Sequence, residues 1–85
     1  MAKVTVYSTR VCPYCRMAEK LLDKKGVAYD KIMVDEMPER REEMERLSGR
    51  KTVPQIFIND TPIGGFTDLA ELERTGKLEA LLAQP

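Results

Sequence analysis

Two cysteines separated by two residues, Cys12 and Cys15, constrain this chain more than any other feature of its sequence. They are its only cysteines, and the 85 residues include no histidine. A pair with this spacing can bind a metal, form a structural disulfide or exchange electrons as a redox dithiol. The residues around the pair indicate which of these chemistries it serves.

A metal site and a purely structural disulfide are both disfavoured. A structural zinc site normally takes four Cys or His ligands, so this chain would need a second copy or an added ligand to complete one. A disulfide between Cys12 and Cys15 would close a very short loop, and short loops remove little entropy from the unfolded chain. The hypotheses that remain are a redox-active pair and two ordinary buried cysteines.

The cysteine pair lies between a predicted strand and a predicted helix. Residues 3–8, KVTVYS, are rich in β-forming residues and predict a strand. From Pro13 onward, apolar residues recur at helical spacing, and charged residues that include Glu19 lie on the opposite face. Pro13 suits a first helical turn because the N–H that it lacks would be unpaired there. We therefore expect Cys12 at the N-terminal edge of a helix and Cys15 one turn inside it.

The rest of the chain predicts further strands and helices in alternation. In chain order they are a strand at 27–34, a helix at 37–49, a strand at 53–58, a short edge strand at 61–63, a helix capped by Thr67 or Asp68 and ending at Gly76, and a last helical segment at 77–83. The order β-α-β-α-β-β-α predicts an α/β fold with a four-stranded mixed sheet flanked by helices. Its first two strands should be parallel and joined by a right-handed crossover. No repeat or linker interrupts the chain, so we expect a single domain over residues 1–85.

Helix 37–49 is predicted to be mostly solvent-exposed. Met37, Met44 and Leu47 form a narrow apolar stripe, and almost all other positions are charged.

Charge and hydropathy argue against two classes of partner. Fourteen basic and fourteen acidic residues cancel, which disfavours nucleic-acid binding by bulk electrostatics. No apolar run approaches the ~20 residues of a membrane span, and the first residues are too polar for a secretory signal. We expect a cytoplasmic monomer without nucleic-acid or membrane partners. In the cytosol thiols are kept reduced, so spaced cysteines are more often catalytic or metal-binding than structural.

The expected position of Cys12 favours thiolate chemistry. A free thiol titrates near ~8.5, but the unpaired N–H groups and partial positive charge of a helix N-terminus stabilise an anion. Cys12 is therefore the predicted nucleophile, with the N–H groups of Tyr14 and Cys15 as donors to its sulfur. Arg10 and Arg16 are close in sequence and add positive potential. Cys15 should face inward and act second, as the resolving thiol.

Three motifs together resemble the dithiol glutaredoxins. They are CPYC at 12–15, TVPQIFI at 52–58 and GGFTDL at 64–69, and the stretch 41–58 is bacterial in style. The resemblance covers nearly the whole chain and implies a thioredoxin fold. It also implies a glutathione-dependent oxidoreductase that reduces protein–glutathione mixed disulfides through one thiol and protein disulfides through two. Glutathione would be a co-substrate, no cofactor would be permanently bound, and ribonucleotide reductase would be one candidate among the protein partners.

The resemblance further implies a glutathione site. In that family the proline corresponding to Pro54 is cis, so the backbone of Val53 would pair with the cysteinyl unit. The γ-glutamyl end would lie at the start of the third helix, where Asp68 would pair with its ammonium group. Arg41 would contact the glycyl carboxylate. Asp68 as a plain helix cap and Arg41 as a solvated surface residue remain alternatives.

Gly64 and Gly65 would let the protein backbone approach the ligand closely. The implied glutathione contacts are Tyr14, Arg41, Thr52, Val53, Pro54, Gly65, Thr67 and Asp68, with Arg10 and Pro13 supporting Cys12.

Two positions depart from the family pattern. Thr9 stands where relatives commonly have lysine, so either Arg10 supplies the missing charge or the cationic support is weaker. Phe66 stands where many relatives have cysteine or another small residue.

Two alternative functions also remain: a glutaredoxin-like electron donor recharged by thioredoxin reductase, and an iron–sulfur carrier in which two chains and two glutathiones hold a cluster. Pro13 and Cys15 disfavour the carrier by family pattern.

Overall fold

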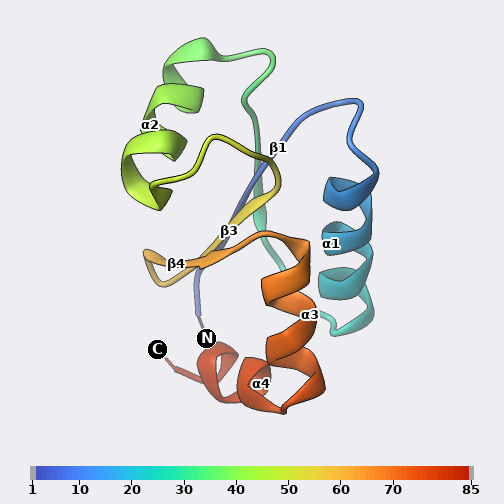
Figure 1. The fold of residues 1–85 in the computed structure, drawn as a ribbon. Coiled ribbons are helices and arrows are strands. Elements are labelled where there is room, and N and C mark those ends of the chain that lie inside the picture. The colour runs from blue at the N-terminus through green and yellow to red at the C-terminus, as the bar shows by residue number, and fades with distance from the viewer. Residues whose placement is uncertain (1, 85) are drawn as a thin grey trace.

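The computed structural model describes residues 2–84 (Figure 1). The elements in chain order are β1 Val4–Ser8, α1 Pro13–Lys24, β2 Asp30–Met33, α2 Pro38–Ser48, β3 Gln55–Ile58, β4 Thr61–Gly64, α3 Phe66–Arg74 and α4 Lys77–Leu82. This is the predicted element order, with the last helical segment as a separate helix after α3. No helix of residues 2–84 has both the length and the apolarity needed to cross a membrane.

The four strands form one mixed sheet in the order β2-β1-β3-β4. Strands β1 and β2 run parallel, as predicted, and β3 is antiparallel to both β1 and β4. Strand β4, which contains Pro62, lies at an edge, where the missing N–H of proline is tolerated.

The register of the sheet brings three distant segments to the same edge. The loop that carries Cys12 leaves β1 after Ser8. Because β3 is antiparallel to β1, its first residue Gln55 pairs with Tyr7, near that same end. Gly64, the last residue of β4, pairs with Ile56. The start of α1, the segment before β3 and the start of α3 therefore converge beyond one end of the sheet.

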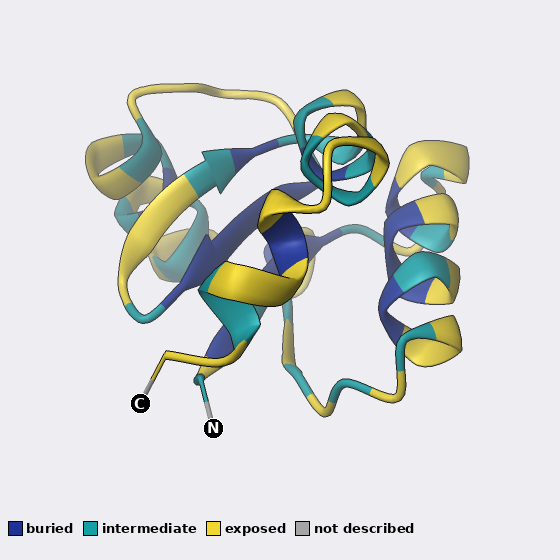
Figure 2. Ribbon diagram, turned by 90° about the horizontal axis from the view of Figure 1, so that it is seen from below, coloured by how far each residue is buried: buried dark blue, intermediate teal, exposed yellow. Residues whose placement is uncertain are grey.

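Helices cover both faces of the sheet, with α1 and α3 on one side and α2 on the other (Figure 1). The strands between them are mostly buried (Figure 2). Alternation along β1 explains the two cores, since Val6 points into one and Tyr7 into the other. The larger core contains Val4, Val6, Ala18, Leu22, Ile56, Ile58, Leu69 and Leu78, and the smaller core contains Tyr7, Val34, Met44 and Phe57.

The structure corrects two details of the sequence prediction. The N-cap of α3 is Gly65 and neither Thr67 nor Asp68; Asp68 lies at the third helical position, where its carboxylate accepts the N–H of Gly65 at 3.0 Å. The second correction concerns the apolar stripe of α2. Met44 is fully buried, but Leu47 is 51% exposed and Met37 is also exposed.

Strand β2 begins at Asp30, three residues later than predicted. Val27 lies in the turn that follows α1, where its N–H donates to the carbonyl of Leu22 at 3.0 Å. Strand β3 likewise begins at Gln55, after Pro54, which has no N–H to donate to a ladder.

Candidate active site

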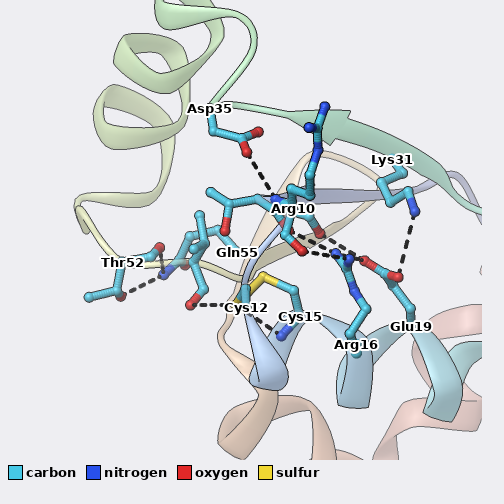
Figure 3. Close-up of a disulfide and its surroundings, with 12 residues drawn as sticks. Arg10, Cys12, Cys15, Arg16, Glu19, Lys31, Asp35, Thr52 and Gln55 are labelled. Carbon is cyan, nitrogen blue, oxygen red and sulfur yellow. Dashed lines mark hydrogen bonds and ion pairs between the residues drawn. A yellow bond between two sulfur atoms is a disulfide. The ribbon is translucent and has the colours of Figure 1, made fainter.

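Cys12 is the N-cap residue of α1, as the sequence predicted. Its backbone is extended, with φ −157° and ψ 99°, and its sulfur accepts the N–H of Cys15 at 3.1 Å. The two cysteines form a disulfide with their Cα atoms 5.2 Å apart (Figure 3). The pair is therefore in its oxidised form, and one sulfur already lies where the helix N-terminus would stabilise a thiolate.

The two sulfurs differ in their access to solvent. Cys15 is completely buried, whereas Cys12 is partly exposed. Val11 and Tyr14 beside it are 89% and 59% exposed, so neither of these side chains is packed inward. Only Cys12 can be reached by an incoming disulfide, and Cys15 is accessible through Cys12 alone.

Arg16 holds the loop that carries Cys12. Its guanidinium donates to the carbonyl oxygens of Thr9 and Arg10 at 2.9 and 3.2 Å (Figure 3). From the other side, the carboxylate of Asp35 accepts the N–H of Arg10 at 3.0 Å. The Arg10 side chain, predicted to support Cys12, pairs with Glu36 at 3.2 Å on the exposed side of this loop.

Glu19 is a buried carboxylate, although helical spacing predicted it on the face of α1 opposite the apolar residues. Its residue is 7% exposed, and its side chain accepts hydrogen bonds from Ser8 Oγ at 3.1 Å and from Arg16 at 3.0 Å. Lys31 Nζ lies 3.6 Å away. Helical spacing alone did not reveal this burial, because the partners come from β1 and β2 as well as from α1.

A cavity of about 220 Å³ lies where the three segments converge. Its lining includes every predicted glutathione contact except Arg41, together with two residues that were not predicted as contacts. The lining residues are Tyr14, Arg50, Thr52, Val53, Pro54, Gly65, Phe66, Thr67 and Asp68. A larger cavity of about 420 Å³ lies between residues 25–28 and α4, away from the cysteines.

The segment before β3 faces the disulfide. The Val53–Pro54 peptide bond is cis, as the resemblance implied. The carbonyl oxygen of Val53 lies 3.9 Å from Cys12 Sγ, so this backbone is adjacent to the reacting sulfur. A Cβ at Gly65 would lie 3.4 Å from the carbonyl oxygen of Pro54, which shows how closely the start of α3 approaches this segment.

Asp68 and Arg50 form an ion pair at the cavity. Asp68 Oδ2 lies 3.0 Å from Arg50 Nη1 and 3.0 Å from the N–H of Gly65. The Gly65 N–H, followed by the Arg50 guanidinium, lowers the pKa of the Asp68 carboxyl, so it is ionised at neutral pH. A Cβ at Gly64, whose φ is +115°, would overlap the Asp68 carboxylate, so glycine is required there. No motif in the sequence marked Arg50.

Arg41 lies outside this cavity lining. Its guanidinium donates to the carbonyl oxygen of Lys51 at 3.1 Å and pairs with Glu45 at 3.6 Å. It therefore ties α2 to the segment that leads into Thr52. Within residues 2–84, no group of three or more Cys, His, Asp or Glu side chains is arranged to hold a metal ion.

Comparison with known proteins gives consistent matches. Residues 4–63 match the family described as Glutaredoxin. The chain is 52% identical over 83 residues to a glutaredoxin of Neisseria meningitidis serogroup A, covering 96% of this chain and 98% of that protein. It is 48% identical over 82 residues to glutaredoxin 3 of Escherichia coli K12, covering 96% and 99%. The crystal structure of a buckwheat glutaredoxin–glutathione complex aligns with a TM-score of 0.88 at 32% identity, covering 95% of this chain and 76% of that one.

Proposed function

The chain belongs to the glutaredoxin family, and from this premise we propose how its own residues carry out the reaction. It has the thioredoxin-like fold and is a glutathione-dependent thiol–disulfide oxidoreductase. The observation that carries the proposal is the asymmetry of the disulfide: Cys12 is accessible at a helix N-cap and Cys15 is buried one turn later. We assign Cys12 as nucleophile and Cys15 as resolving thiol.

A protein–glutathione mixed disulfide is reduced through Cys12 alone. The Cys12 thiolate attacks the glutathione sulfur and forms a Cys12–glutathione disulfide. The S–S bond of the substrate breaks, and the substrate protein's sulfur leaves as a thiolate that takes up a proton. A second glutathione, as thiolate, then attacks the Cys12–glutathione disulfide and releases oxidised glutathione. The Cys15 N–H, which contacts Cys12 Sγ at 3.1 Å, stabilises the thiolate both as attacking and as leaving group.

A protein disulfide requires both cysteines. The Cys12 thiolate attacks one sulfur of the substrate and forms a mixed disulfide with it, while the substrate S–S bond breaks and its other sulfur leaves as a thiolate. Cys15, once deprotonated, attacks Cys12 Sγ, releases the second substrate thiol and leaves the Cys12–Cys15 disulfide, which is the state of the structure. Two glutathione molecules then reduce this disulfide and leave as oxidised glutathione.

The cavity is proposed to bind glutathione in an extended form along the Val53 backbone. Strand-like pairing would hold the cysteinyl unit beside Cys12, with Tyr14 at the sulfur. The carboxylate of the γ-glutamyl end would meet the backbone N–H groups of Thr67 and Asp68, and its ammonium group would meet the carboxylate of Asp68. We retain Arg41 as a proposed contact of the glycyl carboxylate, since its guanidinium already lies at the Lys51 carbonyl.

The setting of this reaction is also a proposal. We propose that residues 1–85 act as one cytoplasmic domain and a monomer, with glutathionylated and disulfide-containing proteins as substrates and ribonucleotide reductase as one candidate. The glutathione complex of the buckwheat relative supports the co-substrate.

Single cysteine variants test the assignment of roles. Cys12→Ser should abolish turnover of both substrate classes. Cys15→Ser should keep the reduction of glutathione mixed disulfides and lose the reduction of protein disulfides, because only the latter needs a resolving thiol. Continued turnover by the Cys12 variant would remove the proposed nucleophile.

The route of recycling is tested on the oxidised protein. It is mixed either with glutathione, glutathione reductase and NADPH or with thioredoxin reductase and NADPH, and the thiols formed are counted. Regeneration by the first mixture alone supports the proposal. Regeneration by thioredoxin reductase would favour the electron-donor alternative, and visible absorbance of the purified protein would favour a cluster carrier.

A further inference from the structure

Arg50 is held over the cavity by a fixed backbone. It follows Gly49, the left-handed residue that ends α2. The hydroxyl of Ser48 accepts the N–H of Arg50 at 3.0 Å and lies 3.1 Å from its carbonyl oxygen. The same hydroxyl donates to the carbonyl of Met44, a buried residue of α2. The position of Arg50 is therefore set by the helix end, and its side chain extends from there to Asp68.

The ion pair between Arg50 and Asp68 is poorly suited to a purely structural role. Their side chains are 53% and 44% exposed, and ion pairs that exposed contribute about 0–1 kcal/mol. Both residues line the cavity, where Arg50 is the single cation and Asp68 the single anion of the lining residues. The pair thus places opposite charges about 3 Å apart, and separating them costs little free energy.

We propose that Arg50 is a specificity-determining residue that binds the α-carboxylate of the γ-glutamyl unit while Asp68 binds its ammonium group. The proposal rests on the proposed glutathione function. An amino-acid head group carries its two charges on one carbon atom, so a receptor needs an anion and a cation side by side. On binding, the head group replaces one protein ion pair with two protein–ligand ion pairs.

Electrostatics supply the reason that Asp68 cannot do this alone. A ligand carboxylate next to the ammonium that Asp68 binds also lies near the Asp68 carboxylate, which repels it. The N–H groups at the start of α3 bind an anion, but the N–H of Gly65 already donates to the Asp68 carboxylate. A guanidinium beside Asp68 offsets the repulsion and offers several donors in one plane.

The test combines protein variants with ligand analogues. Arg50→Gln removes the cation and Asp68→Asn removes the anion. Arg74→Gln serves as the matched control, because Arg74 forms an exposed ion pair with Glu71 near the other end of α3. The substrates are one reporter thiol in mixed disulfide with glutathione, with 4-aminobutanoyl-Cys-Gly, which lacks the α-carboxylate, or with glutaryl-Cys-Gly, which lacks the ammonium group.

Each variant should affect KM only for substrates that carry the ligand charge its removed side chain would bind. Arg50→Gln should raise KM for the glutathione substrate about five- to tenfold with little change in kcat, as loss of one charge-assisted contact implies. It should have no effect on KM with the analogue that lacks the carboxylate, and it should keep its effect with the analogue that lacks the ammonium. Asp68→Asn should show the opposite dependence, and Arg74→Gln should behave like the unaltered protein with all three substrates.

Four results would overturn the inference. An Arg50→Gln effect of equal size with all three substrates would mean that Arg50 acts only on the structure of the cavity. A lower KM in that variant would mean that Arg50 merely competes with the ligand for Asp68. If Arg50→Gln had no effect while the unaltered protein turned over the glutathione substrate, Arg50 would have no role in binding and the proposed function would stand. Failure of the unaltered protein itself on that substrate would overturn both.

Discussion

At the scale of single residues, Glu19 is the charge on which the loop before Cys12 depends. Its carboxylate accepts hydrogen bonds from Ser8 and Arg16, and Arg16 in turn holds two carbonyl groups of that loop. Arg16 Nε is buried and has no hydrogen-bond partner within residues 2–84. Removing Glu19 would take the counter-charge from Arg16, whose side chain is 40% exposed but whose Nε is buried, and would take this acceptor from the buried hydroxyl of Ser8. This loss is more costly than that of one surface ion pair.

We therefore predict that Glu19→Ala lowers the free energy of unfolding by about 1–3 kcal/mol. Urea denaturation measures this, with Lys20→Ala, at an exposed position of the same helix, as the control. The Lys20 variant should change stability by less than about 0.5 kcal/mol. Equal losses in the two variants would show that the buried network contributes nothing beyond helix propensity.

Gly64 permits the second residue-scale prediction, because Gly76 provides a matched comparison. Both glycines have positive φ, at +115° and +79°, but only a Cβ at Gly64 would meet other atoms, those of Asp68 and Arg50. Gly76→Ala should cost about 1 kcal/mol of stability from backbone conformation alone. Gly64→Ala should cost more, roughly 2–3 kcal/mol, because strain and overlap add.

Only the Gly64 change should also raise KM for the glutathione substrate, because it displaces Asp68. Thermal unfolding and steady-state kinetics separate the two effects. A Gly76 variant that raised KM as much would indicate that general destabilisation, and not the position of Asp68, controls binding.

At the scale of elements, α2 is anchored to the sheet by a part-buried hydrogen bond. The hydroxyl of Tyr7 in β1 donates to Glu43 of α2 at 2.6 Å. Burial, and then this bond to Glu43, raise the pKa of Tyr7 from 10.0 to about 12. The folded state thus holds the Tyr7 proton more tightly than the unfolded state does. The resulting stability is complete below pH 10 and is lost as the pH rises toward 12.

We predict that Tyr7→Phe is less stable than the unaltered protein at pH 8 by about 1 kcal/mol, the value of one hydrogen bond. Between pH 10 and about 12 this difference should shrink and then reverse, since the unaltered protein loses up to roughly 3 kcal/mol that the variant does not. Tyr29, whose pKa is also raised, chiefly by burial, is present in both proteins, so its titration cancels in the comparison. Denaturation at a series of pH values gives the two curves, and parallel curves would contradict the assignment.

The sequence predicted most elements because their signals are local. Periodicity, Pro13 and the positions of glycines predicted α1, α2 and the order of the elements along the chain, up to a few residues at the ends. The position of Cys12 as the N-cap of α1 was predicted from the same signals. Arg50 and the burial of Glu19 escaped prediction because their partners are distant in sequence: Asp68 is 18 residues from Arg50, and Ser8 is 11 residues from Glu19. Such contacts depend on sheet register, which local patterns do not specify.

At the scale of the whole molecule, the site is assembled from segments that rest on different cores. Cys12 caps α1, Cys15 lies within it and Asp68 belongs to α3, and both helices pack on the larger core. Thr52, Val53 and Arg50 follow α2, whose one buried residue in the described range 38–48 is Met44. The thiol chemistry and one wall of the cavity proposed to bind glutathione therefore depend on separate packing.

This division predicts that α2 opens more easily than α1. Native-state hydrogen exchange should show α2 amides exchanging through local openings of lower free energy, because few apolar contacts hold this helix.

Met44→Ala should lower that free energy further and raise KM for the glutathione substrate, since residues 50–53 lose their support. It should leave the rate of Cys12 alkylation by a small electrophile unchanged, because α1 and the larger core are intact. Leu22→Ala, in the larger core, should instead destabilise the whole fold by about 2–5 kcal/mol. If Met44→Ala changed Cys12 reactivity as strongly as glutathione binding, the two walls of the site would move as one unit, and the independence of the two cores would be wrong.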